Sequence, residues 1–310
     1  MQPPTFLSAQ DRQLQSPSIS IITLHLRRQQ HTRRLVESLD AHTTLPFELV
    51  VVSQEADAET RAFFRQIADE RRVRTDRHGM TVLFNERNVG TAAGRNQGLR
   101  AAGGSLAVLI DNDTEVSAGW LEPLVESLKQ DPTAVAVGSM ILTPRGRPQY
   151  CSHYVVERWG GDGSRSIGLH MDRHFDADDP AINQACEVPW YPTTCLMLRR
   201  SCLAGDELFD EGFALAEEDK DICLSLRRAG YRILYNPASR VSHLGHPREP
   251  VYAAIRENLS QLNRDRRLFE EKWSCGVINE SSRRFLEQSG VSPEQIALCE
   301  RISLFMKVVP

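Results

Sequence analysis

Short apolar runs alternate along this chain with longer segments whose apolar residues recur at helical spacing. Residues 18–24, 47–52 and 81–84 predict strands, because they are short, apolar and bounded by polar segments. Between them, residues 32–39 and 58–67 repeat apolar positions every third or fourth residue, which is typical of amphipathic helices. This alternation predicts βαβ units with right-handed crossovers and therefore a mostly parallel sheet.

One apolar run leads directly into acidic residues. Residues 106–110 predict a strand buried inside the sheet, and Asp111, Asn112 and Asp113 follow it immediately. Open α/β sheets bind ligands at the carboxyl ends of their strands, so both carboxylates can face one cation there. Oxygen ligands of this kind suit Mg²⁺ or Mn²⁺, which also bind substrate phosphates. Taken alone, the pair would favour an acidic loop with a helix N-cap near Asp113 or Thr114 over a metal site.

The second half of the chain continues the alternation, with one interruption. We expect helices at 120–129 and 219–229 and strands at 134–142, 195–198 and 231–235, the last closed by Asn236 and Pro237. The segment 143–187 lacks periodicity and is rich in glycine and charge, which predicts an excursion lying over the active site. The predicted organisation is a flexible tail at 1–17, a main domain at 18–250 and a C-terminal helical extension at 251–310. The main domain divides into 18–142, the excursion 143–187, and 188–250.

Composition narrows the class of protein. The 310 residues carry a net charge of −4, which gives no reason to expect nucleic-acid binding. The seven cysteines are odd in number and form no C-x-x-C pair, which favours reduced thiols over a disulfide framework. There is no apolar run of membrane-spanning length and no signal-peptide pattern. These features predict a cytoplasmic protein.

Three features leave alternatives open. His170 and His174 have the spacing of zinc ligands on a helix, but their flanks favour a solvated loop. Trp190 and Tyr191 suit either stacking on a sugar or core packing. The basic segment 256–267 suits a solvated helix face, with peripheral contact at the inner face of the membrane, or with a partner, as the alternative.

Several short motifs follow one another in co-linear order. They are Asn88-Val89-Gly90, Gly94-Arg95-Asn96-Gln97-Gly98, Leu109-Ile110-Asp111-Asn112-Asp113-Thr114-Glu115, Gly119-Trp120-Leu121, Leu208-Phe209-Asp210-Glu211-Gly212-Phe213, Glu217-Glu218-Asp219-Lys220-Asp221, Arg228-Ala229-Gly230-Tyr231-Arg232-Ile233 and Val241-Ser242-His243. This order resembles the family 2 inverting glycosyltransferases, over residues 18–142 and 188–246. The resemblance implies an α/β GT-A (Rossmann-like) fold, with a mostly parallel central sheet flanked by helices. It also implies a nucleotide-diphosphate sugar as donor.

The resemblance assigns roles in a metal site. It implies that Asp113 binds Mn²⁺ or Mg²⁺ directly and that Asp111 reaches the metal or the ribose. It also implies that His243 completes the metal site, with His246 as the weaker candidate. Neutral imidazole is a common metal ligand, although a histidine in a loop is also often just hydrogen-bonded.

The resemblance also places the general base in the helix predicted at 219–229. It implies Asp219 as the base, with Glu218 as the second choice and Asp221 as an orienting or capping residue. Acidic residues in a first helical turn are otherwise common partners of the helix dipole, which is the simpler explanation. A base must lie within hydrogen-bond reach of the acceptor hydroxyl, and a helix N-terminus is a rigid platform for it.

Nucleotide contacts are expected at strand ends and at one loop–helix junction, where backbone N–H groups suit phosphates. The turn after the second strand departs from the family pattern, so either Glu55 or Asp57 is expected to replace the acid that contacts the base. The other expected contacts are Thr23, Asn88, Arg95, Asn96, Asp111 and Asn112.

The function predicted from these residues is metal-dependent transfer of a sugar, with inversion, to the hydroxyl of a glycan, lipid-linked, peptide or small-molecule acceptor. A nucleotidyltransferase acting on sugar phosphates is one alternative. It would normally carry a glycine-rich phosphate loop after the first strand, whereas residues 25–30 contain no glycine. A non-catalytic sugar-nucleotide-binding module is the other, and it would be expected to lose the acids at 111, 113, 218 and 219.

Overall fold

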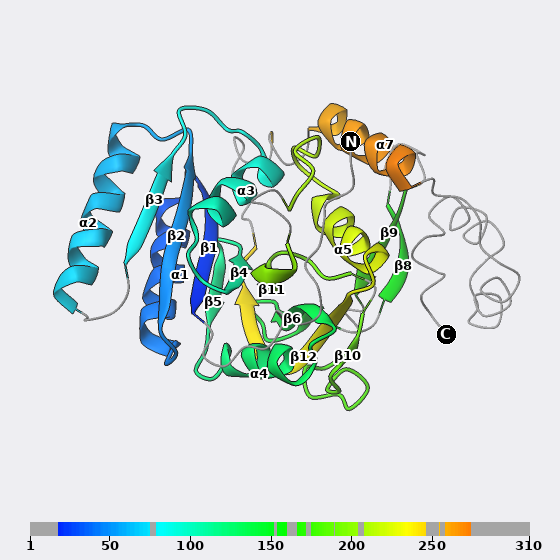
Figure 1. Cartoon of the computed structure of the whole chain (residues 1–310). Coiled ribbons are helices and arrows are strands. Elements are labelled where there is room, and N and C mark those ends of the chain that lie inside the picture. The colour runs from blue at the N-terminus through cyan, green and yellow to red at the C-terminus, as the bar shows by residue number, and fades with distance from the viewer. Residues whose placement is uncertain are drawn as a thin grey trace, which may run out of the picture.

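The computed structural model describes residues 18–74, 79–151, 154–159, 166–171, 175–188, 190–203, 208–245, 254 and 258–273. They build a ten-stranded mixed sheet with helices packed against it (Figure 1). Its strands follow the order β10-β12-β6-β11-β4-β1-β2-β3, with β5 beside β12 and β7 beside β6. The predicted fold class is therefore confirmed.

The first half of the sheet is parallel. Its elements are β1 (Ile19–Leu26), α1 (Gln29–His42), β2 (Phe47–Gln54), α2 (Ala58–Arg74), β3 (Met80–Phe84), α3 (Thr91–Ala101) and β4 (Leu106–Ile110).

The order of these strands explains where a ligand can enter. The chain steps from β1 to β2 to β3 in one direction, and α3 then carries it back to β4 on the other side of β1. Right-handed crossovers therefore place α1 and α2 on one face of the sheet and α3 on the other. The crevice between β1 and β4, at their carboxyl ends, is the position at which such sheets bind ligands. Gly98 lets α3 approach β1, since an added Cβ would lie 2.4 Å from Ile22 Cγ2.

The second half of the sheet is mixed. Its elements are β5 (Thr114–Val116), α4 (Glu122–Gln130), β6 (Ala134–Leu142), β7 (Pro148–Tyr150), β10 (Cys186–Glu187), β11 (Cys195–Arg199), a 3₁₀ turn (Arg200–Cys202), α5 (Glu218–Arg228) and β12 (Arg232–His243). β11 runs antiparallel between β4 and β6, whereas β12 pairs with β6 in parallel. Because β11 pairs with both β4 and β6, it joins the two halves of the sheet into one continuous core.

The prediction that the last strand ends at Tyr235 is wrong. β12 continues to His243, with a register irregularity against β6 between Asn236 and Arg240. Pro237 lies in this irregularity, where its lack of an N–H group removes no hydrogen bond between the strands. The Asn236 side chain donates to Ser127 Oγ of α4 at 2.8 Å, which holds the irregular segment against the sheet.

The predicted excursion contains β7 and a separate hairpin of β8 (Tyr154–Trp159) and β9 (Ser166–Met171). The His170 side chain, His174 and His246 lie outside the described residues, as do the tail at 1–17 and residues 274–310. The C-terminal helix that is described, α7 (Leu259–Trp273), lies beside α5 (Figure 1). Within the described part of the chain, no helix combines the length and apolar character needed to cross a bilayer.

Candidate active site

A cavity of about 340 Å³ opens at the carboxyl ends of β1 and β4, within the size range of small-molecule sites. Segments far apart in the sequence contribute to its wall, including the turn after β4, the first turn of α5 and the end of β12. The predicted site residues that line it are Asn88, Arg95, Asp111, Asn112, Asp113, Glu218, Asp219 and His243.

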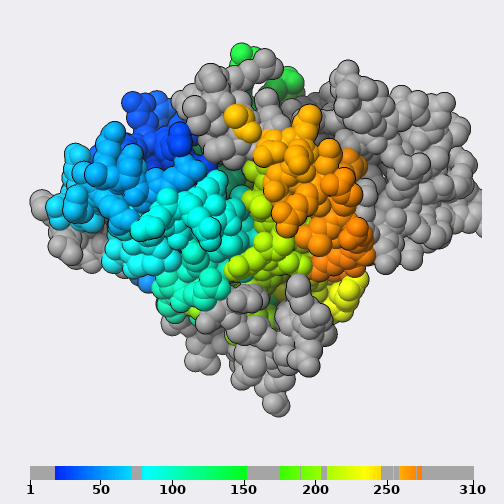
Figure 2. Space-filling model, turned by 90° about the horizontal axis from the view of Figure 1, so that it is seen from above, coloured from blue at the N-terminus to red at the C-terminus, as the bar shows by residue number. Residues whose placement is uncertain are grey.

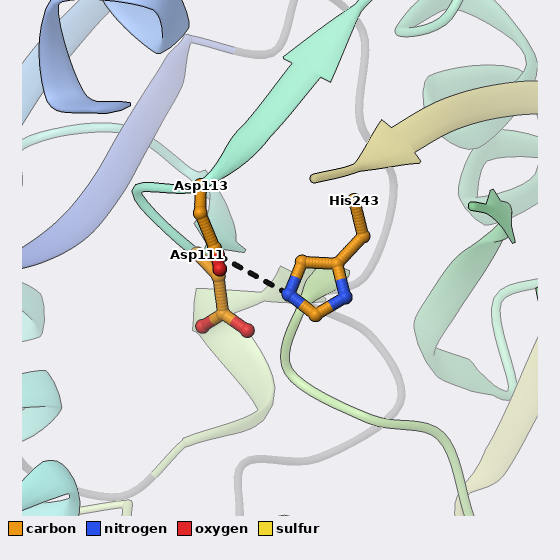
Figure 3. A group of neighbouring side chains, drawn as sticks. All are labelled: Asp111, Asp113 and His243. Carbon is orange, nitrogen blue, oxygen red and sulfur yellow. Dashed lines mark ion pairs between the residues drawn. The ribbon is translucent and has the colours of Figure 1, made fainter. Parts of the chain in front are cut away.

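Asp111, Asp113 and His243 form the candidate metal site, because one ligand atom of each lies within 4.8 Å of the other two (Figure 3). His243 Nε2 lies 3.2 Å from Asp113 Oδ1. Strand pairing creates this contact: β5 follows the acidic turn, and its Thr114 pairs with His243 at the end of β12. The Leu244 N–H group donates to the Asp113 carbonyl at 2.8 Å and fastens the two segments.

The orientation of His243 fits a cation at this position. Its Nδ1 lies 3.0 Å from Gln149 Oε1, a contact that fits the tautomer with the proton on Nδ1. The other nitrogen, Nε2, then faces a carboxylate oxygen at hydrogen-bond distance. In that tautomer Nε2 carries no proton and lies beside a carboxylate oxygen, so the two atoms can bind one metal ion. A neutral imidazole fixed by an outer partner is the usual form of a histidine ligand.

The charge of the cavity also favours a cation. Among the described residues that line it, five carboxylates stand against two cationic side chains, a formal charge of −3 with neutral His243. An anionic phosphate ligand is repelled by such a wall unless a cation is bound. The acids are Asp111, Asp113, Glu217, Glu218 and Asp219, and the cations are Arg95 and Lys220.

Arg95 joins the two acidic groups of the site. Its Nη1 bonds Glu218 Oε1 at 2.5 Å, and its Nη2 lies 3.5 Å from Asp111 Oδ1. Only 8% of Arg95 is exposed, and its guanidinium lies over the Phe209 ring. We predicted a nucleotide contact for Arg95, and the structure places it on the cavity wall as a bridge between two carboxylates.

Asp219 lies in the first turn of α5 with an altered acidity. Burial, followed by the negative charge of neighbouring Glu218, raises the pKa of its carboxyl to about 7. Lys220 and Arg95 act in the opposite direction, and Glu217 adds to the increase. A carboxyl group with a pKa near neutrality can hold and release a proton at physiological pH.

Asn96, for which we expected a nucleotide contact, is not among the described residues that line the cavity. Its side chain is fully buried, and its oxygen accepts from the N–H groups of Leu208 and Phe209 at 3.2 and 3.0 Å. Its amide donates to the Phe209 carbonyl and to Glu211 Oε1. All four hydrogen-bonding positions are therefore used to hold the segment before α5.

The turn after β2 also differs from expectation. Asp57 accepts from the Thr60 N–H group at 2.8 Å and caps α2, while Glu55 pairs with Arg27 at 2.8 Å. Neither lines the cavity, and neither does Thr23, which is buried within β1.

Gln54, the residue that does line the cavity from this turn, was missed because it carries no charge. Its oxygen accepts from Asn85 Nδ2 at 3.1 Å and from the Val89 N–H group at 3.2 Å. The two neighbouring aromatic residues have different surroundings. Trp190 lines the cavity, whereas Tyr191 lies in the core and packs against Gly138.

Known proteins resemble this chain in both sequence and structure. The O-antigen biosynthesis protein RfbC of Myxococcus xanthus is 30% identical over 233 residues, which are 74% of this chain and 17% of that protein. The glucosyl-dolichyl phosphate glucuronosyltransferase of Haloferax volcanii is 25% identical over 233 residues, 73% of this chain and 68% of that protein. The chain thus spans a minor part of the first relative and about two thirds of the second.

Two solved structures share the fold. GalNAc-T7 with UDP, GalNAc and Mn²⁺ has a TM-score of 0.59 at 19% identity, covering 76% of this chain and 45% of that one. The mannosyltransferase PcManGT of Pyrobaculum calidifontis, with GDP-Man and Mn²⁺, has a TM-score of 0.58 at 17% identity, covering 94% and 70%. The model of glycosyl transferase family 2 matches residues 20–202, which include the acidic turn after β4 but end before α5. Because this match extends over more than half of the residues, the chain belongs to glycosyl transferase family 2, and its fold is GT-A.

Proposed function

We propose that this protein transfers a sugar from a nucleotide-diphosphate donor to an acceptor hydroxyl, with inversion and with the help of a divalent metal ion. The observation that carries the proposal is the composition of one cavity. It combines the cluster of Asp111, Asp113 and His243, whose ligand atoms are close enough to hold one metal ion, with Asp219, a carboxyl whose pKa is near neutrality.

Asp111, Asp113 and His243 would hold Mn²⁺ or Mg²⁺, since two carboxylates and one imidazole suit these ions. When bound, the ion neutralises the diphosphate leaving group. Mn²⁺ accompanies a nucleotide or nucleotide sugar in GalNAc-T7 and PcManGT, which supports the same ligands here. Asn88 and Gln54 on the cavity wall are proposed to contact the nucleotide.

Asp219 is the proposed general base. It takes the proton of the acceptor hydroxyl while that oxygen bonds to the anomeric carbon and the bond to the diphosphate oxygen breaks. Attack from the face opposite the leaving group inverts the anomeric configuration. A base with a pKa of about 7 is ionised at physiological pH yet basic enough to take the proton.

Glu218 is less suited to this task. Its carboxylate is buried and bonded to the Arg95 guanidinium at 2.5 Å, so one of its oxygens is already engaged within the protein. We therefore assign Glu218 the role of fixing Arg95 and of raising the pKa of Asp219.

The acceptor is proposed to be a saccharide. This class is supported by the names of the two relatives, one an O-antigen biosynthesis protein and the other a transferase acting on glucosyl-dolichyl phosphate. Trp190 and Tyr150 line the cavity and provide aromatic surface on which a sugar ring can pack.

The test is incubation with Mn²⁺, a panel of nucleotide sugars and a panel of saccharide acceptors. Release of nucleoside diphosphate with a glycosylated product supports the proposal, with the Asp113→Asn variant as the control. Release of pyrophosphate from a nucleoside triphosphate and a sugar phosphate would indicate a nucleotidyltransferase. Binding of a donor with no turnover across the panel would indicate a non-catalytic module.

A further inference from the structure

Asp265 of α7 is a buried carboxylate that holds the loop leading to α5. It is fully enclosed, and its Oδ2 accepts from the N–H groups of Leu215 and Ala216 at 2.8 and 3.0 Å. Its Oδ1 accepts from the Ala214 N–H group at 3.4 Å and from Gln261 Nε2 at 2.7 Å. One charged group thus accepts hydrogen bonds from three consecutive backbone N–H groups, and such bonds are stronger than those between neutral partners.

The same loop is fastened from its other side by α3. The Ala214 carbonyl accepts from the N–H group of Thr91 at 3.0 Å and from its hydroxyl at 3.3 Å. Residues 214–216 line the cavity, and Glu217, in the left-handed region with φ 70°, connects them to Asp219 and the start of α5. The position of Asp219 at the start of α5 therefore depends on how residues 214–216 are held.

α7 is also joined to α5 itself. Asp221 of α5 is 2% exposed, and it accepts from Lys272 Nζ at 2.9 Å and from Trp273 Nε1 at 2.8 Å. The Arg228 guanidinium lies 4.1 Å from the centroid of the Trp273 ring. In Figure 2, α7 (orange) lies against the yellow-green segment that leads into α5, beside the cyan atoms of α3. One helix thus contacts both the loop and the helix that follows it.

We propose that Asp265 is a positioning residue for the transfer reaction: through the backbone of residues 214–216 it sets the place of Asp219 in the cavity. This inference rests on the proposed function, since it gives Asp265 an effect on the base. A residue that only stabilised the fold would not affect turnover of the folded enzyme. Misplacing a catalytic group by about 1 Å can cost about 100-fold in rate.

The experiment compares Asp265→Asn and Asp265→Ala with wild type and with Asp40→Asn, in the full-length protein. In Asp265→Asn, the amide group must face at least one loop N–H group whichever way it turns, so both variants disturb the loop. Asp40 pairs with buried Arg71 between α1 and α2, away from the cavity, so its replacement tests for a loss of stability alone. The measurements are kcat, KM for the acceptor, calorimetric binding of the donor with Mn²⁺, melting temperature, and kcat as a function of pH.

Both Asp265 variants are expected to lower kcat by about 10- to 100-fold while donor binding changes less than about twofold. The acidic limb of the kcat profile should also move to lower pH, because a loosened turn exposes Asp219 to water. Asp40→Asn should lower the melting temperature without either change.

If Asp219→Asn abolishes turnover while both Asp265 variants retain wild-type kcat and pH profile, the positioning role is refuted and the proposed function stands. If wild type transfers no sugar, the proposed function fails, and this inference with it.

Discussion

The pH dependence of turnover tests the assignment of Asp219, because burial and the charge of Glu218 raise the pKa of this carboxyl to about 7. A general base must be ionised to act, so kcat should fall as the pH drops below about 7. One pH unit below its pKa a carboxyl is about 9% ionised, and two units below it about 1%. At about pH 5, wild-type kcat should therefore be about 1% of its plateau, whereas a base of ordinary acidity would retain about 90%.

Replacement by asparagine keeps the shape of Asp219 and removes its basicity. Asp219→Asn should lower kcat by about 10²- to 10⁴-fold and leave only a weak pH dependence. Donor affinity should change little, because Asp219 is not part of the metal cluster. Asp57→Asn is the matched control: this carboxylate caps α2 outside the cavity, and asparagine caps a helix equally well.

The same pKa has a consequence for stability. Between about pH 4 and pH 7 the folded state binds a proton at Asp219 that the unfolded chain has released, so stability from this group is lost as the pH rises. Raising the pKa from 3.8 to about 7 costs the folded state up to about 4 kcal/mol above neutral pH. Asp219→Asn should thus equal wild type in stability near pH 4 and exceed it near pH 8.

The assays are kcat from about pH 4 to about pH 9 and denaturant unfolding near pH 4 and near pH 8. An acidic limb near pH 4, or near wild-type turnover in Asp219→Asn, would refute the reasoning. Glu218→Gln should retain turnover and move the limb to lower pH, because one cause of the raised pKa is gone. An inactive Glu218→Gln beside an active Asp219→Asn would make Glu218 the base.

Three further predictions concern the metal site and the loop. EDTA should abolish transfer and Mn²⁺ or Mg²⁺ restore it; full activity after thorough chelation would contradict a metal site at Asp111, Asp113 and His243. Gln149→Ala should weaken Mn²⁺ binding measured by calorimetry about 10- to 100-fold, because the imidazole loses its outer partner, and unchanged affinity would contradict this role. Gly90→Ala should lower the free energy of unfolding more than Gly146→Ala: both glycines have positive φ, but only at Gly90 would a Cβ meet a backbone atom, 2.9 Å from the Ala214 carbonyl oxygen. Equal losses in urea unfolding would show that this contact is accommodated.

Local sequence patterns predicted much of the fold and part of the site. Asp111 and Asp113 were recognised because they directly follow an apolar run. That run contains no polar residue because β4 lies inside the sheet and all of its residues are buried. The alternation of apolar runs with helical periodicity likewise predicted the parallel half of the sheet, because each strand and helix there buries apolar residues. These features depend on residues close together in the chain.

Features that depend on distant contacts were not predictable in this way. Asn96 has the side chain of a ligand-binding residue, yet it bonds Phe209, which lies 113 residues later in the chain. Asp57 differs, because its partner Thr60 is close in sequence and the bond is an ordinary helix cap. Asp265 carried no signal, because its partners lie about 50 residues earlier in the chain. The continuation of β12 past Pro237 depends on α4 and β6, which no local rule includes.

Backbone strain provides a separate indication of where function lies. Among the described residues, four that are not glycine have positive φ. Arg27 and Arg28 follow β1, Glu55 follows β2, and Glu217 precedes α5. Each lies within two residues of one that lines the cavity, or lines it itself. A conformation of this kind costs about 1–3 kcal/mol and persists only where the surrounding structure imposes it.

At Glu217 the surrounding structure is identified: Thr91 and Asp265 hold the preceding loop, and Asp219 follows within the next turn. The strain at this position is therefore best explained by the placement of Asp219, which turnover measurements in the Asp265 variants can test.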